Sequence, residues 1–117
     1  MNLSLLKNKL IPLDEMLAQK PSPPVSSVLI PIGFSNASGG YEIVMTKRTE
    51  TVMTHKGQVS FPGGLVEASD SHLLHTALRE SWEEVGLKSE HLEVLGALKP
   101  VYTRNSMLIY PFVATLS

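Results

Sequence analysis

The sequence predicts a single α/β domain in which a β-sheet packs against helices. The chain has 117 residues, 43% of them hydrophobic and 18% charged, which suits one buried core and one site. Segments rich in strand-forming residues lie before and after one well-marked helical segment. The sequence contains no internal repeat and no low-complexity segment, so this order of elements decides the fold class.

The first 24 residues are expected to form an opening helix and a linker, ahead of a main domain over residues 25–117. Leucines at positions 5, 6, 10 and 13 approximate helical spacing, and prolines at 21, 23 and 24 end the segment. Charged residues interrupt its apolar positions, unlike a signal peptide, and no stretch approaches the roughly 20 apolar residues of a spanning helix. The default expectation is a cytoplasmic protein without a membrane partner, with an organelle left open.

Five segments are rich in strand-forming residues and bounded by turn residues. We expect strands over residues 25–34, 41–48, 57–61, 92–103 and 107–116. The connection over residues 35–40 is rich in Ser, Asn and Gly, which is typical of a hairpin. The third strand stops at the sequence Pro62-Gly63-Gly64, and a loop is expected from there to the following helix.

The best-defined element is the helix that ends near Val85. Asp70 or Ser71 can cap its start, and Gly86 stands where glycine commonly ends helices. Most of its apolar stripe comes from Leu74, Ala77, Leu78, Ser81, Trp82 and Val85. We expect Trp82 in the core rather than as a platform for stacking a base, and the four histidines at the surface or in caps.

Three carboxylates share another face of this helix, because Glu80, Glu83 and Glu84 fall within an arc of roughly 100°. Like charges at this spacing repel by a few tenths of a kcal/mol per pair, a cost that a bound divalent cation reverses. A pair of glutamates is more often a solvated helix face. Here, however, the helix follows a strand end with Gly63 and Gly64, where backbone can approach a ligand closely. The cluster therefore predicts a site for a hard cation.

The composition favours metal-assisted hydrolysis of a small anionic substrate. A chain without cysteine has no disulfide framework, no thiolate zinc site and no cysteine nucleophile. A metal-activated water cleaves a phosphorus–oxygen bond without a side-chain nucleophile. Ten basic and eleven acidic residues give a formal charge of −1, which is no electrostatic footprint for nucleic acid or an anionic membrane.

The helix and the strand end before it resemble the Nudix hydrolase box. Its second half, Arg-Glu-aliphatic-x-Glu-Glu-x-Gly-aliphatic, is nearly complete from Arg79 to Leu87. Counting from Gly64, the first acidic position falls at Asp70, with eight rather than seven residues between it and Arg79. This spacing, and the sequence of residues 61–70, resemble the coenzyme A diphosphatase branch of the family.

The branch also has an upstream signature, in which Leu-Leu-Thr-x-Arg is followed by a second arginine and by the glycine before Phe-Pro-Gly-Gly. Most of it is matched between Val44 and Gly64. The departures are Thr49 for a Ser or Ala and Met53 for the second arginine, and in the helix Ser81 replaces an aliphatic residue. Met53 makes a different substrate a serious alternative to coenzyme A.

The resemblance implies a Nudix α/β/α sandwich with a mixed β-sheet, C-terminally short in this chain. It implies that Glu83 and Glu84 bind Mg²⁺ or Mn²⁺, with Glu80 as a further ligand or base. The Gly63 carbonyl is an implied extra ligand, and Arg79 is expected to orient the carboxylates. The residues expected to contact the substrate are Arg48, Lys56, Gly57 and Gly64.

The function that the resemblance implies first is a diphosphatase that cleaves coenzyme A or an acyl derivative to 3′,5′-ADP and a 4′-phosphopantetheine. One alternative is a Nudix diphosphatase that acts on NADH, ADP-ribose or a nucleoside triphosphate. The other is a Nudix fold retained as a non-catalytic binding module. The intact cluster argues against that module, because a pure binder has no evident need for mutually repelling carboxylates.

Members of the branch continue well past the motif Tyr110-Pro111-Phe112-Val113, whereas this sequence ends at Ser117. The sequence is then part of a longer protein, a domain that a partner chain completes, or an abbreviated family member. We expect its last strand to lie at an open edge of the sheet, which favours pairing with a second copy. The expectation is a homodimer or weakened activity.

Overall fold

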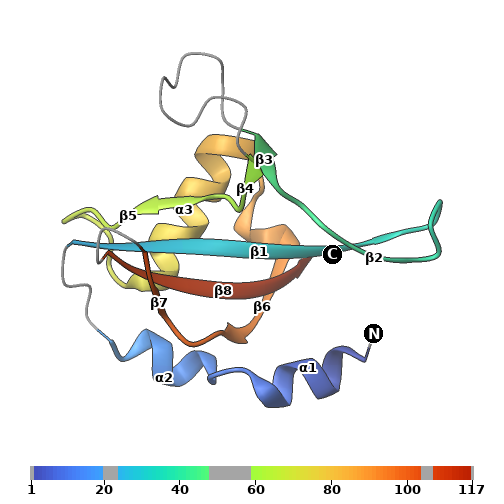
Figure 1. Cartoon of the computed structure of the whole chain (residues 1–117), viewed down its shortest axis with the longest axis horizontal. Helices are drawn as coiled ribbons and strands as arrows, with labels where there is room; N and C mark the ends of the chain where they lie inside the picture. Colours follow the sequence, from blue (N-terminus) through green and yellow to red (C-terminus); the bar gives the residue numbers. More distant parts are fainter. Residues whose placement is uncertain (1, 20–23, 48–58, 104–106, 117) are drawn as a thin grey trace.

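The computed structural model describes residues 2–19, 24–47, 59–103 and 107–116, which form a mixed sheet with helices on both faces (Figure 1). The helices are α1 (Leu3–Lys9), α2 (Leu13–Leu17) and α3 (Leu73–Val85), with a short 3₁₀ turn η1 (Ser89–His91). The strands of the sheet are β1 (Val25–Ser35), β2 (Gly40–Ile43), β5 (Gly63–Leu65), β6 (Leu92–Ala97), β7 (Val101–Tyr102) and β8 (Leu108–Leu116). Two further strands, β3 (Thr46–Lys47) and β4 (Val59–Ser60), pair only with each other. The α/β class is confirmed.

Strands β1 and β8 run parallel through the middle of the sheet, from the pair Val25 and Leu108 to the pair Ile32 and Thr115. On its other edge β1 pairs with β2 and β5, and β8 pairs with β6 and β7. The expectation that the last strand lies at an open edge is therefore wrong. Its apolar run from Pro111 to Ala114 is buried throughout, which is the pattern of a central strand covered on both faces.

The two faces of the sheet carry different cores. On one face Leu29 and Phe112 pack with Leu73, Leu74 and Ala77 of α3. On the other face a smaller cluster joins the sheet to Leu3, Leu6 and Leu10, at and beside α1. Met16 of α2 belongs to the α3-side core, and α2 contacts β6. The part of the second face that α1 leaves uncovered is where the site described below opens.

The opening segment contains two short helices instead of the one that was expected. Pro12 lacks a backbone N–H and disfavours the helical conformation for the residue before it, so the chain turns extended between the helices. Ile11 uses this break to make two backbone hydrogen bonds with Ala97, of 2.8 and 3.1 Å. The segment is thereby tied to the edge of β6. None of the described helices has the length and apolar character needed to cross a membrane.

Several strand boundaries differ from those expected. The segment over residues 41–48 leaves the main sheet after Ile43, and the segment over residues 92–103 is broken before β7 at Pro100, which cannot donate to a strand pair. Residues 63–65 form a strand where a loop was expected, because β5 pairs antiparallel with residues 26–28 of β1. The hairpin between β1 and β2 is confirmed.

Helix α3 begins at a different cap from the one expected. The side chain of His72 accepts a hydrogen bond from the backbone N–H of His75, so His72 is the N-cap instead of Asp70 or Ser71. Gly86 ends the helix at φ +71°, a conformation that suits glycine, as the sequence predicts. Trp82 is 54% exposed, so its placement in the core was wrong. The helix packs closely through the small residues Ala77 and Ser81, and Trp82 lies beyond that contact.

Replacing Gly63 by alanine should destabilise the fold, because a Cβ at this position would meet the carbonyl oxygen of Ser27 and lie 2.6 Å from Cα of Val28. We expect a loss of roughly 1–3 kcal/mol in the free energy of unfolding, measured by denaturant titration. Gly40→Ala is the matched control, since nothing lies within 4 Å of a Cβ there. Equal effects of the two substitutions would contradict the close packing of β5 on β1.

Candidate active site

A buried ion pair between Arg79 and Asp70 forms the centre of the site. Nε of Arg79 donates to Oδ1 of Asp70 at 2.9 Å, and Nη2 donates to Oδ2 at 3.0 Å. Asp70 also accepts bonds from the backbone N–H of Glu67 at 2.9 Å and the hydroxyl of Thr76 at 2.7 Å. Its side chain is 0% exposed, and that of Arg79 is 18% exposed. The pair therefore ties the loop before α3 to the middle of the helix.

The hydrogen bonds from Arg79 hold the pKa of Asp70 well below its usual range, although desolvation by burial acts in the opposite direction. The same bonds raise the pKa of Arg79 above its ordinary value. Both groups stay charged throughout the physiological range. The guanidinium is therefore a fixed positive charge, and it can hold other carboxylates in place.

Two of the predicted carboxylates contact the other side of this guanidinium. Nη1 of Arg79 donates to Glu80 at 2.9 Å and to both carboxylate oxygens of Glu83 at 3.3 Å. Nη2 also donates to the carbonyl oxygen of Leu65 at 3.3 Å, which adds a link to β5. Arg79 thus lies in contact with Glu80 and Glu83, and its role in orienting them for catalysis stays a prediction.

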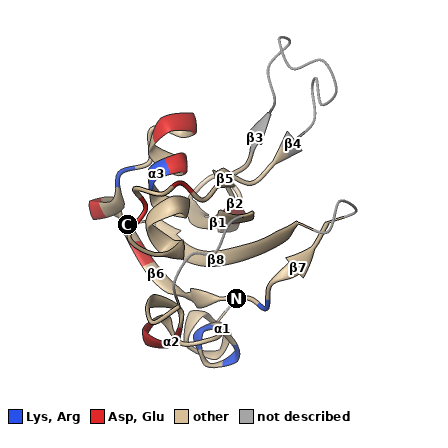
Figure 2. Cartoon of the chain, turned by 90° about the vertical axis from the view of Figure 1, so that its left-hand side faces the viewer, with Lys and Arg blue, Asp and Glu red and all other residues tan. Residues whose placement is uncertain are grey.

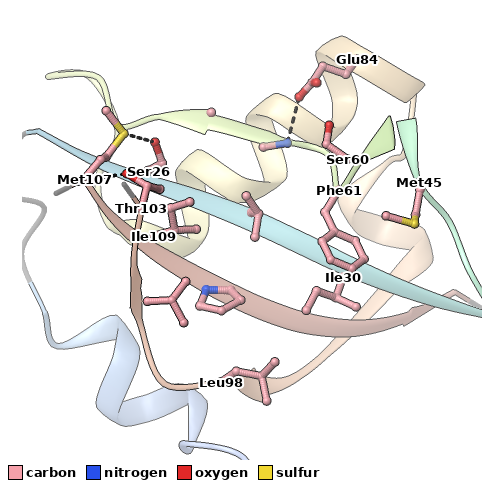
Figure 3. A pocket seen from close by; sticks show the side chains of 15 residues that line it. Ser26, Ile30, Met45, Ser60, Phe61, Glu84, Leu98, Thr103, Met107 and Ile109 are labelled. Atoms are coloured by element: carbon pink, nitrogen blue, oxygen red, sulfur yellow. Dashed lines mark hydrogen bonds between the residues drawn. The ribbon is translucent and has the colours of Figure 1, made fainter. Parts of the chain in front are cut away.

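The glycines of β5 bring its backbone against the carboxylates of α3. The N–H of Gly63 donates to Oε2 of Glu84 at 2.9 Å (Figure 3). A Cβ on Gly64 would lie 2.7 Å from Cδ of Glu80, so the lack of a side chain at Gly64 lets this carboxylate lie against the backbone of β5. The predicted residues Gly63, Gly64, Glu80 and Glu84 are therefore gathered at one place by the pairing of β5 with β1 and the packing of α3.

The donor atoms gathered here are of the kind that a hard divalent cation prefers. Among the described residues, Arg79 pairs with four carboxylates, those of Glu67, Asp70, Glu80 and Glu83. Glu84 adds a further carboxylate beside Gly63. Figure 2 shows these acidic segments gathered on and around α3. The excess of carboxylate oxygens over positive charge fits Mg²⁺ or Mn²⁺ in its chemistry.

The carboxylates as placed are nevertheless held on protein partners. Within the described ranges, no three acidic or histidine side chains lie close enough together to hold a metal ion. Arg79 donates hydrogen bonds to Glu80 and Glu83, and the N–H of Gly63 donates one to Glu84. A cation that binds here therefore has to exchange at least some of these hydrogen bonds for metal–oxygen contacts.

A cavity of about 850 Å³ opens beside the carboxylates, on the sheet face opposite α3 (Figure 3). Gly63, Gly64 and Glu84 form part of its wall, so the cluster and the cavity are continuous. The remaining wall comes from β1, β7, β8 and the segments next to them, and it is mainly apolar. Its volume is typical of a site for a small organic ligand.

The other residues that were expected to contact substrate, Arg48, Lys56 and Gly57, lie outside the described residues, as do Thr49 and Met53. Two features of the site were missed by sequence reasoning. Asp70 was predicted only as the first acidic position of the box and as a possible helix cap. An acidic residue in the loop before a helix that carries an arginine also indicates an ion pair. The cavity wall was missed because alternating apolar strand residues look the same whether they line a cavity or a core.

The family model described as the NUDIX domain matches residues 24–115 of the chain. The chain belongs to the Nudix family. Nudix hydrolases act on diphosphate bonds in nucleoside diphosphate derivatives and generally use divalent metals such as Mg²⁺ or Mn²⁺. The predicted family and the Nudix fold are both confirmed.

Relatives of this Nudix chain include the mitochondrial coenzyme A diphosphatase NUDT8 of Mus musculus. It is 39% identical over 95 residues, which cover 80% of this chain and 44% of the mouse protein. An uncharacterized Nudix hydrolase NudL of Photorhabdus laumondii is 39% identical over 74 residues, 63% of this chain and 40% of that protein. The chain thus spans less than half the length of these two curated relatives.

Solved structures show the same fold at low sequence identity. A C. elegans Ap4A hydrolase binary complex has a TM-score of 0.64 and 16% identity, covering 78% of this chain and 64% of that one. The Nudix hydrolase RenU from M. smegmatis has a TM-score of 0.65 and 16% identity, covering 80% and 61%. At this identity the likeness concerns the fold alone.

Replacing Asp70 by asparagine should lower stability at neutral pH by roughly 3 kcal/mol, because it leaves Arg79 without its buried partner. The pKa of Asp70 is lower in the folded chain than in the unfolded one, so its charged form stabilises the fold above about pH 4. That contribution is lost as the pH falls below this value. The difference in unfolding free energy between wild type and Asp70→Asn should therefore shrink between pH 6 and pH 3.

Denaturant titrations at several pH values measure this difference. Glu93→Gln, on the exposed part of β6, is the control and should leave stability nearly unchanged across the range. If the difference in unfolding free energy between wild type and Asp70→Asn is the same at pH 3 and pH 6, the charge of Asp70 does not contribute to stability.

Proposed function

We propose that this chain is a metal-dependent diphosphatase that cleaves coenzyme A or its acyl derivatives to 3′,5′-ADP and a 4′-phosphopantetheine. The observation that carries the proposal is the continuity of the carboxylate cluster with the cavity, which share Glu84, Gly63 and Gly64. A diphosphate at this junction has carboxylates on one side and room for an organic group on the other. The similarity to the mouse coenzyme A diphosphatase supports this choice of substrate.

Each residue of the cluster has a role in this reaction. Glu83 and Glu84 would hold Mg²⁺ or Mn²⁺, with Glu80 and the carbonyl oxygen of Gly63 as further ligands. When bound, the ion would neutralise phosphate charge and lower the pKa of the attacking water. Arg79 holds Glu80 and Glu83 in place through the hydrogen bonds described above.

The glycines of β5 and the fixed Arg79 supply the positioning. Because Gly64 has no side chain, a phosphate can approach the backbone of β5 beside the Glu80 carboxylate. Glu80 would accept the proton of the attacking water when it is not a ligand. Preorganised charges of this kind act without rearrangement during the reaction.

A second candidate substrate class is another nucleoside diphosphate derivative, such as NADH, ADP-ribose or a nucleoside triphosphate. Met53 favours it, because this methionine stands where the coenzyme A branch has an arginine. The cluster and its chemistry are unchanged in this case, and only the group attached to the diphosphate differs. Substrate profiling separates the two.

Hydrolysis of coenzyme A, NADH, ADP-ribose and dGTP should be measured with Mg²⁺ or Mn²⁺, with products separated by chromatography. We expect release of 3′,5′-ADP from coenzyme A at a rate well above that for the other three. Preferential cleavage of NADH or ADP-ribose would replace the first substrate class by the second. No cleavage of any of them by the folded chain would contradict a catalytic role for the chain alone.

Glu83→Gln and Glu84→Gln should each reduce kcat by at least roughly 10²-fold, because each removes a charged ligand from the metal site. Both glutamates are exposed on the helix, so the variants should stay folded, as checked by circular dichroism and thermal unfolding. Glu90→Gln, on the exposed turn η1, is the control and should keep full activity. Wild-type rates in both α3 variants would rule out the cluster as the metal site.

A further inference from the structure

We propose that the cavity on the sheet face opposite α3 takes up an uncharged aliphatic chain of the substrate, the acyl end of an acyl-pantetheine, and leaves the nucleotide outside. The inference rests on the proposed function. It assigns the two groups that the diphosphate joins, the acyl-pantetheine and the nucleotide, to different places. Figure 3 shows Glu84 on one side of the cavity and Leu98 on the opposite side. The pantetheine arm attached to a phosphate near Glu84 would extend across the sheet and carry the acyl group towards Leu98.

The floor of the cavity is an apolar surface built by the two central strands. Val28 lies beside Pro111 in the parallel register, and Ser26 lies beside Ile109. Ile30 continues this surface along β1. Among the described residues of the wall, the one ionisable side chain is Glu84, at the diphosphate end. Positive side chains are favourable partners for a phosphate-bearing nucleotide, and the described residues of this wall include none.

Two hydroxyl groups in the wall of the cavity, those of Ser26 on β1 and Thr103 after β7, each have a partner within the protein. Ser26 donates its hydroxyl hydrogen to the sulfur of Met107 at 3.1 Å. The hydroxyl oxygen of Thr103 accepts a bond from the backbone N–H of Met107 at 3.2 Å (Figure 3). Recognition of a base depends on polar groups placed to bond its edge. Met107 orients both hydroxyls, and Ser60 is the one other hydroxyl-bearing residue among the described wall residues, so the wall favours a ligand that makes few hydrogen bonds there.

The wall also exposes apolar side chains that such a chain would cover. Met45, Leu98 and Val101 are 44%, 43% and 54% exposed. Covering apolar surface is favourable whatever the shape of the chain, because the effect follows the area removed from water. The methionines Met45 and Met107 have flexible, polarizable side chains that adapt to chains of different length. The cavity therefore suits acyl chains of a certain length and does not select one specific chemical group.

The test is a series of saturated acyl-coenzyme A substrates of increasing chain length, assayed with Mg²⁺ by release of 3′,5′-ADP. KM should fall as the chain lengthens, by at most about four-fold for each methylene that is buried, until the cavity is filled. Among these substrates, unacylated coenzyme A should be the one whose rate changes least when residues of the cavity wall are substituted. A KM that does not change with chain length would overturn the inference while leaving the proposed function intact.

Leu98→Asp and Val101→Asp place a carboxylate in the wall at exposed positions, where folding is least affected. Both should raise the KM for the longest acyl substrate at least ten-fold and change that for coenzyme A much less. Leu5→Asp is the matched control, since Leu5 is 59% exposed on α1 and does not line the cavity. An equal loss for all substrates in the wall variants would overturn the inference.

A binding measurement without turnover separates this inference from the proposed function. Calorimetric titration of the metal-free wild type with an S-acyl pantetheine and with 3′,5′-ADP should show binding of the first, weakened in Leu98→Asp. Binding of 3′,5′-ADP that Leu98→Asp abolishes would place the nucleotide in the cavity and overturn the inference. This result does not depend on catalysis, whereas absence of 3′,5′-ADP release from every substrate would overturn the proposed function.

Discussion

The arrangement of the site depends on the buried ion pair between Arg79 and Asp70. A buried charge without a partner costs several kcal/mol. Each of the two side chains therefore holds the other in position. Asp70 is held by the loop before α3 and by Thr76, and Arg79 reaches β5 through the carbonyl oxygen of Leu65. One guanidinium therefore sets the distance between the helix, the loop and the strand.

The pairing of β5 with β1 supplies the second constraint. Gly63 packs so closely on β1 that no side chain fits, and Gly64 leaves space for the carboxylate of Glu80. These two contacts bring a polar helix face to the rim of an apolar cavity. The sheet thus has two uses: one face forms the α3-side core, and the other provides a wall on which an organic ligand can lie. A diphosphate substrate requires both kinds of surface at adjacent positions.

Much of the site could be read from the sequence because its signals are local. Glu80, Glu83 and Glu84 belong to one helix, so helical geometry alone places them on one face, and Gly86 marks the end of that helix. The paired glycines before the helix were also recognisable. The prediction that Arg79 lies among these carboxylates agrees with its hydrogen bonds, and the catalytic roles of all four residues stay predictions.

The features that were missed depend on contacts between distant segments. The central position of β8 follows from its pairing with both β1 and β6, and an edge strand and a central strand differ in sequence only by how continuous the apolar run is. Trp82 was placed in the core because it continues an apolar stripe, but the helix packs through its smaller neighbours. Pro12 splits the opening helix, and the hydrogen bonds of Ile11 with Ala97 stabilise the break. No local sequence pattern reveals this pairing.

The central claim is that a divalent cation binds between α3 and β5. The most direct test is a titration of the ¹⁵N-labelled protein with Mn²⁺, in which paramagnetic broadening of the amide signals locates the ion. The account predicts that the amides of Gly63, Gly64 and the residues around Glu83 and Glu84 broaden first, and that added Mg²⁺ restores them by competition. Broadening centred elsewhere, for example on the carboxylates of α2, or no saturable broadening, would contradict it.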